Sequence, residues 1–478
     1  MDMFIDGGWV AALSGQGMPV TDPTTGAVID TVPLGQAADA ERAIASAARA
    51  FETWKRVPMA ERVRLVKACA QAMRDQAPRI GAALNRELGR PLPGCIAEIA
   101  SSANLLDIYA EEGLRLYATQ ALGSAPGERI VVTRDPVGVV VAITPFNYPI
   151  TLLMFKLGAA LIAGCPVVTK PSEDTPLSTL LLAELFHATG LPAGLFNVVT
   201  GARELGEALV AHPVPRKIAF TGSVPAGKAI AAAAAGTMKR VTLELGGHSA
   251  AIVCADADLD RAAEAITRHG FANSGQFCYR VNRLYVERPV YEALLERLAT
   301  RARKLTLAPA GGEGDLGPLV NARIFATSEQ QIADARAKGA RILAGGDRAT
   351  GAGYDGGCYM PPTLIADATP EMLIMREETF GPVIGIAPVD SPAEGLRLAN
   401  DSRFGLAGFV FTRDLALGMA LCEGFEAGSV WLNDIQRASH HVPFGGMKES
   451  GLGREKGRYG VESYLEYKTM YLSWEPPL

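Results

Sequence analysis

The stretch VGVVVAITPFNYPITLLMFKLGAALIAGCPVVTK, residues 137–170, decides the fold of this chain. VGVVVAI is typical of a buried strand, TLLMFKLGAALIAG of a helix and PVVTK of a second strand. The stretch is too interrupted to span a membrane, because Pro145, Pro149 and Lys156 leave no window of about 20 residues free of breakers or charge. It therefore predicts a strand, a loop, a buried helix and a strand in succession.

The same alternation continues further along the chain. Helix-like segments, the first expected over 175–190 with Thr175 as its cap, alternate with the strand-like runs FNVVTG, RKIAF and VTLEL. After Gly246 and Gly247 the pattern restarts with SAAIVC, a long helix from Asp258, and the runs RLYVE, GFVFT and SVWLND. Apolar strands separated by helices predict parallel sheets covered on both faces, which bind ligands at the carboxyl ends of their strands.

Two segments fit neither of these α/β units. Residues 117–136, YATQALGSAPGERIVVTRDP, are typical of a protruding hairpin, and YLEYKTMYLSW, residues 464–474, shows the aromatic alternation of a pairing strand. Exposed strand edges of this kind are places where another chain can pair. We therefore predict two doubly wound α/β domains and a small β arm for subunit assembly.

Composition argues against several classes of function. The 478 residues carry a formal net charge of −5, with a pI near 5.8, so we expect no nucleic-acid or membrane partner. The seven cysteines lack a CxxC pair, and adjacent His440 and His441 cannot face one metal from a regular element, so neither disulfides nor a metal site is expected. The first residues, MDMFIDGGWVAALSG, lack a signal-peptide pattern, and we expect a cytoplasmic protein.

Three short motifs place reactive groups beside turns. Cys278, in FANSGQFCYRVNRLYV, is either a small core residue or a nucleophile. Glu244 ends the strand of LELGG, and is either a solvated strand end or a general base beside glycines that admit a ligand. Asn147, between the prolines of PFNYP, is either a turn residue or a held amide that stabilises an oxyanion.

Two further motifs are candidates for nucleotide binding. GSVPAGK, residues 222–228, has P-loop spacing, but Ala229 follows where Ser or Thr would hold magnesium, so nucleoside triphosphate hydrolysis is not expected. The turn still offers a helix amino end to a phosphate. KPSE, residues 170–173, supplies either a surface ion pair or a grip on ribose hydroxyls. No GxGxxG fingerprint is present, so a standard Rossmann site is not supported.

Taken in order, the motifs PFNYP, KPSE, FTGS, LELGG, GQFC, EETFGP and PFGGMKESGLGRE resemble those of the aldehyde dehydrogenase superfamily, of the NAD(P)-dependent, non-acylating type. The resemblance covers essentially the whole chain. It implies two doubly wound α/β domains, one binding the cofactor and one catalytic, plus a small β oligomerisation arm. The implied boundaries are 1–116 and 137–246 for the NAD(P)-binding domain, 247–459 for the catalytic domain, and 117–136 and 460–478 for the arm.

The resemblance also implies a mechanism for oxidising an aldehyde to a carboxylic acid. Cys278 would attack the aldehyde carbon to give a thiohemiacetal and, after hydride transfer, a thioester. Asn147 and the backbone N–H of Cys278 would hold the oxyanion. Glu244 would activate the water that hydrolyses the thioester. Lys156 and Glu455 are further catalytic candidates, on a proton-exit route.

The implied cofactor is NAD, with NADP possible, because the carboxylate of Glu173 would repel a 2′-phosphate. Lys170 and Glu173 would bind the adenosine ribose, Ser223 would meet the pyrophosphate, and Glu378 and Phe380 would hold the nicotinamide ribose. The full expected set of cofactor residues is Thr144, Phe146, Lys170, Ser172, Glu173, Phe220, Gly222, Ser223, Leu245, Gly246, Glu378 and Phe380.

The implied substrate tunnel is largely apolar and aromatic. Relatives specific for succinic semialdehyde carry arginines where this chain has Phe155 and Ala272. We therefore expect an uncharged aromatic or medium-chain aldehyde. The alternative is a carboxylate-bearing semialdehyde bound by Arg280 or Arg437. The expected tunnel residues are Tyr148, Leu152, Phe155, Phe277, Tyr279 and Phe444.

Two other classes of protein are alternatives to a non-acylating aldehyde dehydrogenase. CoA-acylating relatives usually lack the glutamate of LELGG, so Glu244 counts against them. A non-catalytic structural or binding protein on the same fold would tolerate loss of the nucleophile, whereas every expected chemical residue is present. The expected partners are a small-molecule aldehyde and further copies of the chain, in a homodimer or homotetramer, as the family's habit implies.

Overall fold

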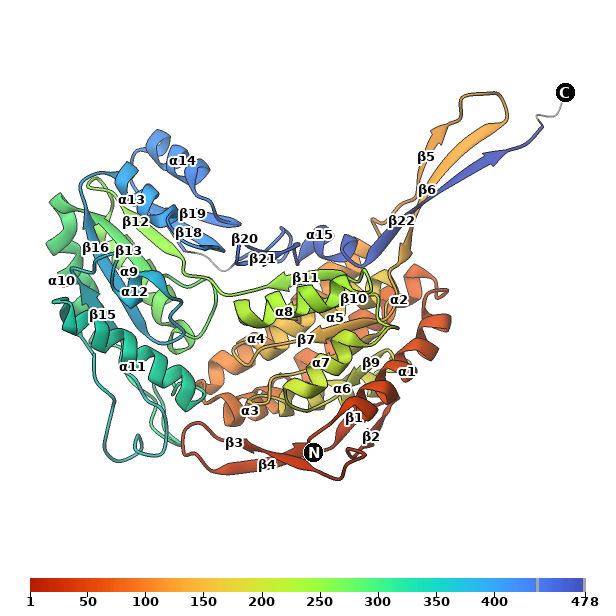
Figure 1. Cartoon of the computed structure of the whole chain (residues 1–478), viewed down its shortest axis with the longest axis horizontal. Helices are drawn as coiled ribbons and strands as arrows, with labels where there is room; N and C mark the ends of the chain where they lie inside the picture. The colour runs from red at the N-terminus through yellow and green to blue at the C-terminus, as the bar shows by residue number, and fades with distance from the viewer. Residues whose placement is uncertain (436–437, 476–478) are drawn as a thin grey trace.

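The computed structural model describes residues 1–435 and 438–475. Figure 1 shows two α/β halves side by side, with a ribbon of strands that projects from the half containing the amino terminus. Each half is built on an open sheet, of eight strands in the first and seven in the second, and three strands form the projecting arm. The fold class that the sequence predicts is confirmed. No helix within the described ranges is long and apolar enough to cross a membrane.

The helices are α1 (Ala37–Trp54), α2 (Met59–Asp75), α3 (Ala77–Leu88), α4 (Leu92–Gly113), α5 (Pro149–Ala163), α6 (Leu177–Ala188), α7 (Arg203–Ala211), α8 (Val224–Ala235), α9 (Leu259–Phe271), α10 (Tyr291–Ala302), α11 (Ala322–Ala337), α12 (Leu373–Arg376), α13 (Pro392–Asn400), α14 (Leu415–Gly424) and α15 (Gly457–Glu462). Short 3-10 helices cover Ala272–Gly275 and Arg288–Val290. The strands are β1 (Met3–Ile5), β2 (Gly8–Val10), β3 (Gly17–Thr21), β4 (Val28–Pro33), β5 (Thr119–Leu122), β6 (Glu128–Pro136), β7 (Val140–Ile143), β8 (Val167–Lys170), β9 (Phe196–Val198), β10 (Lys217–Thr221), β11 (Arg240–Glu244), β12 (Ala250–Val253), β13 (Arg283–Glu287), β14 (Arg341–Ala344), β15 (Thr363–Ala366), β16 (Val383–Val389), β17 (Phe404–Gly405), β18 (Ala407–Phe411), β19 (Ser429–Leu432), β20 (Met447–Lys448), β21 (Gly451–Leu452) and β22 (Leu465–Ser473).

The first sheet has parallel strands at its centre and helices on both faces. Its order is β2-β1-β9-β8-β7-β10-β11-β21, and the strands from β9 to β11 run parallel. Val141 of β7 packs in the apolar cluster that includes α1 and α7, whereas Val140 and Ala142 pack in the cluster around α5. Because both faces are buried, the strands are continuous apolar runs instead of alternating ones.

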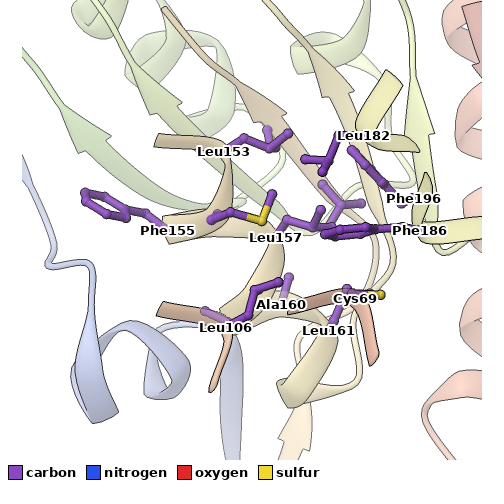
Figure 2. Close-up of a cluster of buried hydrophobic side chains, with 14 of the residues drawn as sticks. Cys69, Leu106, Leu153, Phe155, Leu157, Ala160, Leu161, Leu182, Phe186 and Phe196 are labelled. Atoms are coloured by element: carbon purple, nitrogen blue, oxygen red, sulfur yellow. The ribbon is translucent and has the colours of Figure 1, made fainter. Parts of the chain in front are cut away.

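The core of the first half is built around α5. Every residue of this helix except Thr151 is buried, which explains why its sequence is apolar all round and not amphipathic. Figure 2 shows Leu153 and Leu157 of α5 among the side chains of Leu182 and Phe186 of α6. A helix enclosed in this way is a rigid support for the predicted site residues near its amino end.

The second sheet repeats the architecture. Its order is β14-β15-β16-β13-β12-β18-β19, and the strands from β15 to β19 run parallel. On one face Leu284 and Val286 of β13 pack with side chains of α9 and α10. On the other face Tyr285 packs with side chains of α11 and α14. Successive residues of one strand therefore serve two different apolar clusters.

The arm is an antiparallel sheet in the order β22-β6-β5. β5 and β6 form the hairpin predicted over 117–136, and β22 pairs with β6 along its whole length. The arm extends away from both halves (Figure 1). Tyr471 is 78% exposed and Leu122 is 76% exposed, so the arm presents large apolar side chains to solvent.

The amino ends of α5 and α6 are capped by carboxylates from distant helices. The predicted cap of α6, Thr175, is wrong: the helix begins at Leu177, and the Thr175 hydroxyl donates to the carbonyl of Phe146 at 3.5 Å. Glu87 of α3 accepts instead from the backbone N–H groups of Leu177 and Ser178, at 2.6 and 3.0 Å. A carboxylate at this position satisfies free N–H groups and complements the positive end of the helix dipole.

Glu98 of α4 has the same role at α5. One of its carboxylate oxygens accepts from the N–H groups of Ile150 and Thr151, both at 3.0 Å. The other oxygen pairs with the guanidinium of Arg90, and both side chains of this ion pair are buried. The pair therefore anchors the amino end of α5 to the helices of the first half.

Removing Glu98 should lower the stability of the protein. In a Glu98→Ala variant the Arg90 guanidinium stays buried without its partner and α5 loses its cap, and breaking a buried ion pair from one side costs about 3–5 kcal/mol. We expect the unfolding temperature in differential scanning calorimetry to fall by several degrees. The control is Glu207→Ala, which removes an exposed pair with Arg203 and should cost less than about 1 kcal/mol. Equal melting of the two variants would contradict the anchoring role.

Candidate active site

The predicted residues of the first half lie along one edge of its sheet. In the strand register, Ile143 at the end of β7 is opposite Lys170 of β8 and Phe220 of β10. Thr221 of β10 is opposite Glu244 of β11. The carboxyl ends of parallel strands meet at the same edge, and this is the edge at which α/β sheets bind ligands.

The loops that enter the second sheet contact this edge. Cys278 precedes β13, and Glu378 and Phe380 precede β16, which pairs with β13. A Cβ atom on Gly247 would lie 2.2 Å from the carbonyl oxygen of Cys278, and one on Gly246 would lie 2.4 Å from a carboxylate oxygen of Glu378. Only glycine admits such an approach. The LELGG segment is therefore in contact with both loops.

The loop before Cys278 holds a strained backbone. Asn273 and Ser274 have φ angles of 49° and 54°, in the left-handed region that is costly for residues other than glycine. The Asn273 side-chain amide donates to the carbonyl of Asn147 at 3.1 Å, and the Ser274 hydroxyl donates to the carbonyl of Gly317 at 2.7 Å. The bond to Asn147 ties the cysteine loop to the PFNYP turn of the other half.

The Cys278 thiol is neutral at neutral pH. Burial raises its pKa to about 12, and the carboxyl groups of Glu244 and Glu378 act in the same direction. The thiolate, not the thiol, is the effective nucleophile. Attack by this sulfur therefore needs a base that removes its proton.

Glu244 is a buried carboxyl with no hydrogen-bond partner at either oxygen among the residues that the structure describes. Its pKa is raised well above the usual range, first by burial and then by the charge of Glu455, while Lys156 acts in the opposite direction. A Cβ atom on Gly445 would lie 2.7 Å from one Glu244 oxygen. A buried, unpaired carboxyl with a raised pKa is suited to taking up and releasing protons.

Lys156 and Glu455 form a buried ion pair that acts on Glu244. The Lys156 ammonium lies 2.7 Å from a Glu455 oxygen and donates, also at 2.7 Å, to the hydroxyl of Thr221. Glu455 raises and Lys156 lowers the pKa of Glu244. The two predicted residues are thus brought together, one from α5 and the other from the segment before α15.

Asn147 is buried in the loop between β7 and α5. Its side-chain oxygen has no hydrogen-bond partner within 1–435 and 438–475. An asparagine that only shapes a turn bonds nearby backbone through that oxygen. The turn interpretation therefore leaves this side chain unexplained, and its amide is suited to a ligand.

The KPSE and FTGS motifs lie at the sheet edge where the predicted residues of the first half meet. Lys170 and Glu173 pair at 2.8 Å, with the lysine buried and the carboxylate largely exposed. Ser223 is the exposed N-cap of α8, and its hydroxyl makes no capping hydrogen bond in that helix. A Cβ atom on Gly222 would lie 2.4 Å from the ring of Phe220. The amino end of α8 is thus open to an anionic ligand.

Glu378 and Phe380 approach the same edge from the second half of the molecule. Glu378 accepts from the N–H of Gly247 at 2.8 Å, and burial raises its pKa to about 7. The Phe380 ring lies 5.9 Å from that of Phe146. Of the remaining predicted cofactor residues, Thr144 and Leu245 are buried and Ser172 is partly exposed.

The predicted tunnel residues lie together as a chain of aromatic rings. Tyr148 is 6.3 Å from Phe277, and Phe277 is 5.2 Å from Tyr279. Phe444 is 5.3 Å from Tyr279 and 6.5 Å from Phe155. The sixth residue, Leu152, is buried in the apolar cluster that also contains Phe155 and Phe444. Cys278 packs against this cluster.

Arg280 faces away from these rings, so the predicted contact with a substrate anion is wrong. The side chain is fully buried, and burial lowers its pKa to about 9. Its guanidinium supports the loops behind the site by donating to the carbonyls of Gly270, Val281, Thr379 and Val383. The other candidate, Arg437, lies outside the described residues.

The sequence does not predict His269, which lies behind the tunnel on α9. Its ring is 4.9 Å from that of Phe277 and 5.3 Å from that of Tyr279. Burial lowers its pKa to about 3, so the imidazole is neutral and serves as an aromatic wall. No signal in its helical segment distinguishes it from an ordinary buried histidine.

Lys456 is the second residue that the sequence does not predict. Its ammonium lies over the rings of Phe155 and Phe444, 4.7 and 4.6 Å from their centroids. Its position next to Glu455, at the end of the motif PFGGMKESGLGRE, is a sequence signal that places it near the site. A cation is therefore present in a tunnel that the sequence predicts to be apolar.

Comparison with known proteins identifies the class. The family model described as "Aldehyde dehydrogenase family" matches residues 9–470. The chain is 41% identical over 471 residues to a 3-sulfolactaldehyde dehydrogenase of Pseudomonas putida, covering 98% of this chain and 96% of that protein. It is 40% identical over 471 residues to a glutarate-semialdehyde dehydrogenase of Pseudomonas aeruginosa, covering 98% and 97%.

A solved structure, described as that of an "E. coli NADP dependent enzyme", matches with a TM-score of 0.95 and 38% identity, over 99% of this chain and 98% of that one. The chain therefore belongs to the aldehyde dehydrogenase family. It is an oxidoreductase that acts on an aldehyde group with NAD(P).

The alkylation of Cys278 should follow its high pKa. Because burial keeps the thiol protonated, the rate of carboxamidomethylation by iodoacetamide should rise with pH through pH 10 without reaching a plateau. Peptide mass spectrometry of the native protein measures the rate at each cysteine. The buried thiols Cys69 and Cys165 are internal controls and should stay unmodified. A plateau at Cys278 near pH 7 would show instead that a stable thiolate exists in the free enzyme.

Proposed function

We propose that this enzyme oxidises a short aldehyde carrying an anionic group, a carboxylate or a sulfonate, to the corresponding acid. The observation that carries the substrate class is the similarity to relatives named for 3-sulfolactaldehyde and glutarate semialdehyde, both of which bear an anion. The uncharged aromatic or medium-chain substrate expected from the apolar tunnel has weaker support. The semialdehyde alternative has the stronger support, although Arg280 is not its ligand.

Cys278 is the proposed nucleophile, and Glu244 is the proposed base. The carboxylate of Glu244 takes the thiol proton, directly or through water, as the sulfur attacks the aldehyde carbon, because the thiol is neutral without help. The amide of Asn147 and the backbone N–H of Cys278 stabilise the oxyanion of the thiohemiacetal. The strained loop and its bond to Asn147 support this role by fixing both groups in advance.

When bound, NAD(P) supplies the hydride acceptor that converts the thiohemiacetal on Cys278 to a thioester. Glu244 then takes a proton from water, and the resulting hydroxide attacks the thioester carbon. The acid leaves and the thiol is restored. The ion pair of Lys156 and Glu455 acts on the pKa of Glu244 in opposite directions, and is the proposed start of the route by which the proton leaves.

The residues present fit the cofactor that the family uses. Ser223 and the open amino end of α8 are suited to a pyrophosphate, and the buried Lys170 with the exposed carboxylate of Glu173 to a ribose. Glu378, whose carboxylate is held by a backbone N–H, and Phe380 are suited to the nicotinamide ribose. The exposed Glu173 favours NAD because it would repel a 2′-phosphate, whereas the similar E. coli enzyme is described as NADP dependent.

Two rival functions have less support. A CoA-acylating dehydrogenase has no use for a buried base at the thioester, and Glu244 is such a base. A non-catalytic protein would have no reason to keep both a strained cysteine loop and a buried carboxyl without a partner. Oxidation of an aldehyde by the purified protein excludes the second rival, and hydrolysis without CoA excludes the first.

The chain organisation that we propose keeps the boundaries implied by the sequence. The NAD(P)-binding domain comprises 1–116 and 137–246, the catalytic domain 247–459, and the oligomerisation arm 117–136 and 460–478. A homodimer or homotetramer is supported by the projecting arm with its exposed apolar side chains. A cytoplasmic location is supported by seven free thiols.

Replacing Glu244 should slow both proposed proton transfers, and hydrolysis more than thioester formation, because water gives up a proton less readily than a thiol does. In Glu244→Gln the water is no longer activated, so turnover of succinic semialdehyde with NAD or NADP should fall by about 10²–10⁴-fold. Mass spectrometry should then find an acyl group on Cys278. The control is Glu449→Gln, which removes a surface carboxylate paired with Lys228. Slow turnover without an acyl adduct would contradict a main role of Glu244 in hydrolysis, because thioester formation would then be the slower step, and an inactive wild type across an aldehyde panel would overturn the function.

The exposed apolar side chains of the arm should be needed for assembly. We expect light scattering to give two or four times the chain mass of 50.4 kDa for the wild type. Tyr471→Glu should shift the mass toward a smaller species, because a charge in a buried interface is costly. Met238→Glu, at an equally exposed site outside the arm, should leave the mass unchanged. A wild type that is monomeric at micromolar concentration contradicts the proposal.

A further inference from the structure

Lys456 is held in an unusual backbone conformation between the two halves of the molecule. Its φ and ψ angles are 70° and 160°, on the side of the map that residues with a side chain rarely occupy. The backbones of Glu455 and Phe444 exchange two hydrogen bonds, each of 2.8 Å. This short bridge brings Lys456 beside the Phe444 ring. Strained backbone of this kind gathers at functional sites.

The ammonium of Lys456 is enclosed and forms no ion pair among the described residues, although the charges of Glu455 and Glu244 act to raise its pKa. The residue is 3% exposed, and the only hydrogen bond that its ammonium makes among the described residues goes to the carbonyl of Ala438 at 3.3 Å. The rings of Phe155 and Phe444 also contact the ammonium. An ammonium has three N–H donors, and cation–π contacts replace only part of its hydration. A buried cation in this state is suited to an anionic ligand.

The ammonium also lies close to the reacting groups. Its charge acts to lower the pKa of Cys278 and of Glu244, and burial lowers its own pKa to about 8. Phe155 and Phe444 are at the same time walls of the aldehyde tunnel. The cation therefore lies over two walls of the tunnel, and its charge reaches the sulfur proposed to attack the aldehyde.

We propose that Lys456 is the specificity residue of this enzyme and binds the anionic end of the substrate while Cys278 attacks the aldehyde end. The inference rests on the proposed function and names the group that recognises its substrate. A lysine is a point charge without the fork geometry of arginine, so it accepts a carboxylate or a sulfonate equally well. Arg280 leaves this role vacant, since its donors are taken by backbone carbonyls.

The test compares an anionic aldehyde with an uncharged one of the same length. Succinic semialdehyde and butanal are oxidised by the wild type and by Lys456→Met, Lys456→Arg and the control Lys67→Met, which removes an exposed lysine of α2. In Lys456→Met the ratio of kcat/KM for the semialdehyde over that for butanal should fall at least tenfold, through a higher KM. The ratio should stay within threefold of the wild type in the other two variants.

A second measurement separates binding from chemistry. Succinate should inhibit wild-type butanal oxidation competitively, and its inhibition constant should rise at least tenfold in Lys456→Met. If kcat/KM falls equally for both aldehydes in Lys456→Met and the inhibition constant of succinate does not change, Lys456 acts on the thiol or on Glu244. That result overturns the inference and leaves the proposed function standing. If the wild type oxidises neither aldehyde, the proposed function fails first. If Lys456→Met does not fold, Lys456→Gly, which removes the backbone strain with the charge, gives the same comparison.

Discussion

The buried carboxylate of Glu98 determines where the active-site helix begins. It closes the first turn of α5 and compensates the charge of Arg90, whose guanidinium lies 4.7 Å above the ring of Tyr148. The same turn follows Asn147, and the helix then carries Phe155 into the tunnel and the lysine of the buried ion pair toward β10. One ion pair thus sets the position of three proposed parts of the site together: the amide that would bind the oxyanion, one tunnel wall and the lysine of the buried pair.

Most of the fold could be predicted because its signals are local. Continuous apolar strands separated by helices identify a parallel sheet, and the carboxyl ends of its strands then place KPSE, FTGS and LELGG in one row. The caps could not be predicted in this way. Thr175 is a reasonable local cap for α6, but Glu87, 90 residues earlier, occupies the position instead. A carboxylate supplied by another helix leaves no trace in the sequence next to the helix that it caps.

The two cations near the site show how far sequence proximity can mislead. Arg280 stands two residues after the proposed nucleophile, yet its guanidinium points to backbone carbonyls of α9, of β16 and of the segment before β16. Lys456 is remote from Cys278 in the chain and reaches the tunnel through a bridge between two loop backbones. The sequence supplies candidates for chemistry through motifs, whereas the direction of a side chain depends on tertiary contacts that no motif encodes.

The path of the chain also connects the two halves of the molecule. After building the second sheet, the chain returns to add β21 to the edge of the first and β22 to the arm. The first sheet and the arm therefore lack a strand until residues 451–473 are present, whereas the second sheet is built entirely from strands of its own half. Glu244, the proposed base, pairs with Gly451 of β21, so the sheet edge that holds this carboxyl is complete only when nearly the whole chain has been made.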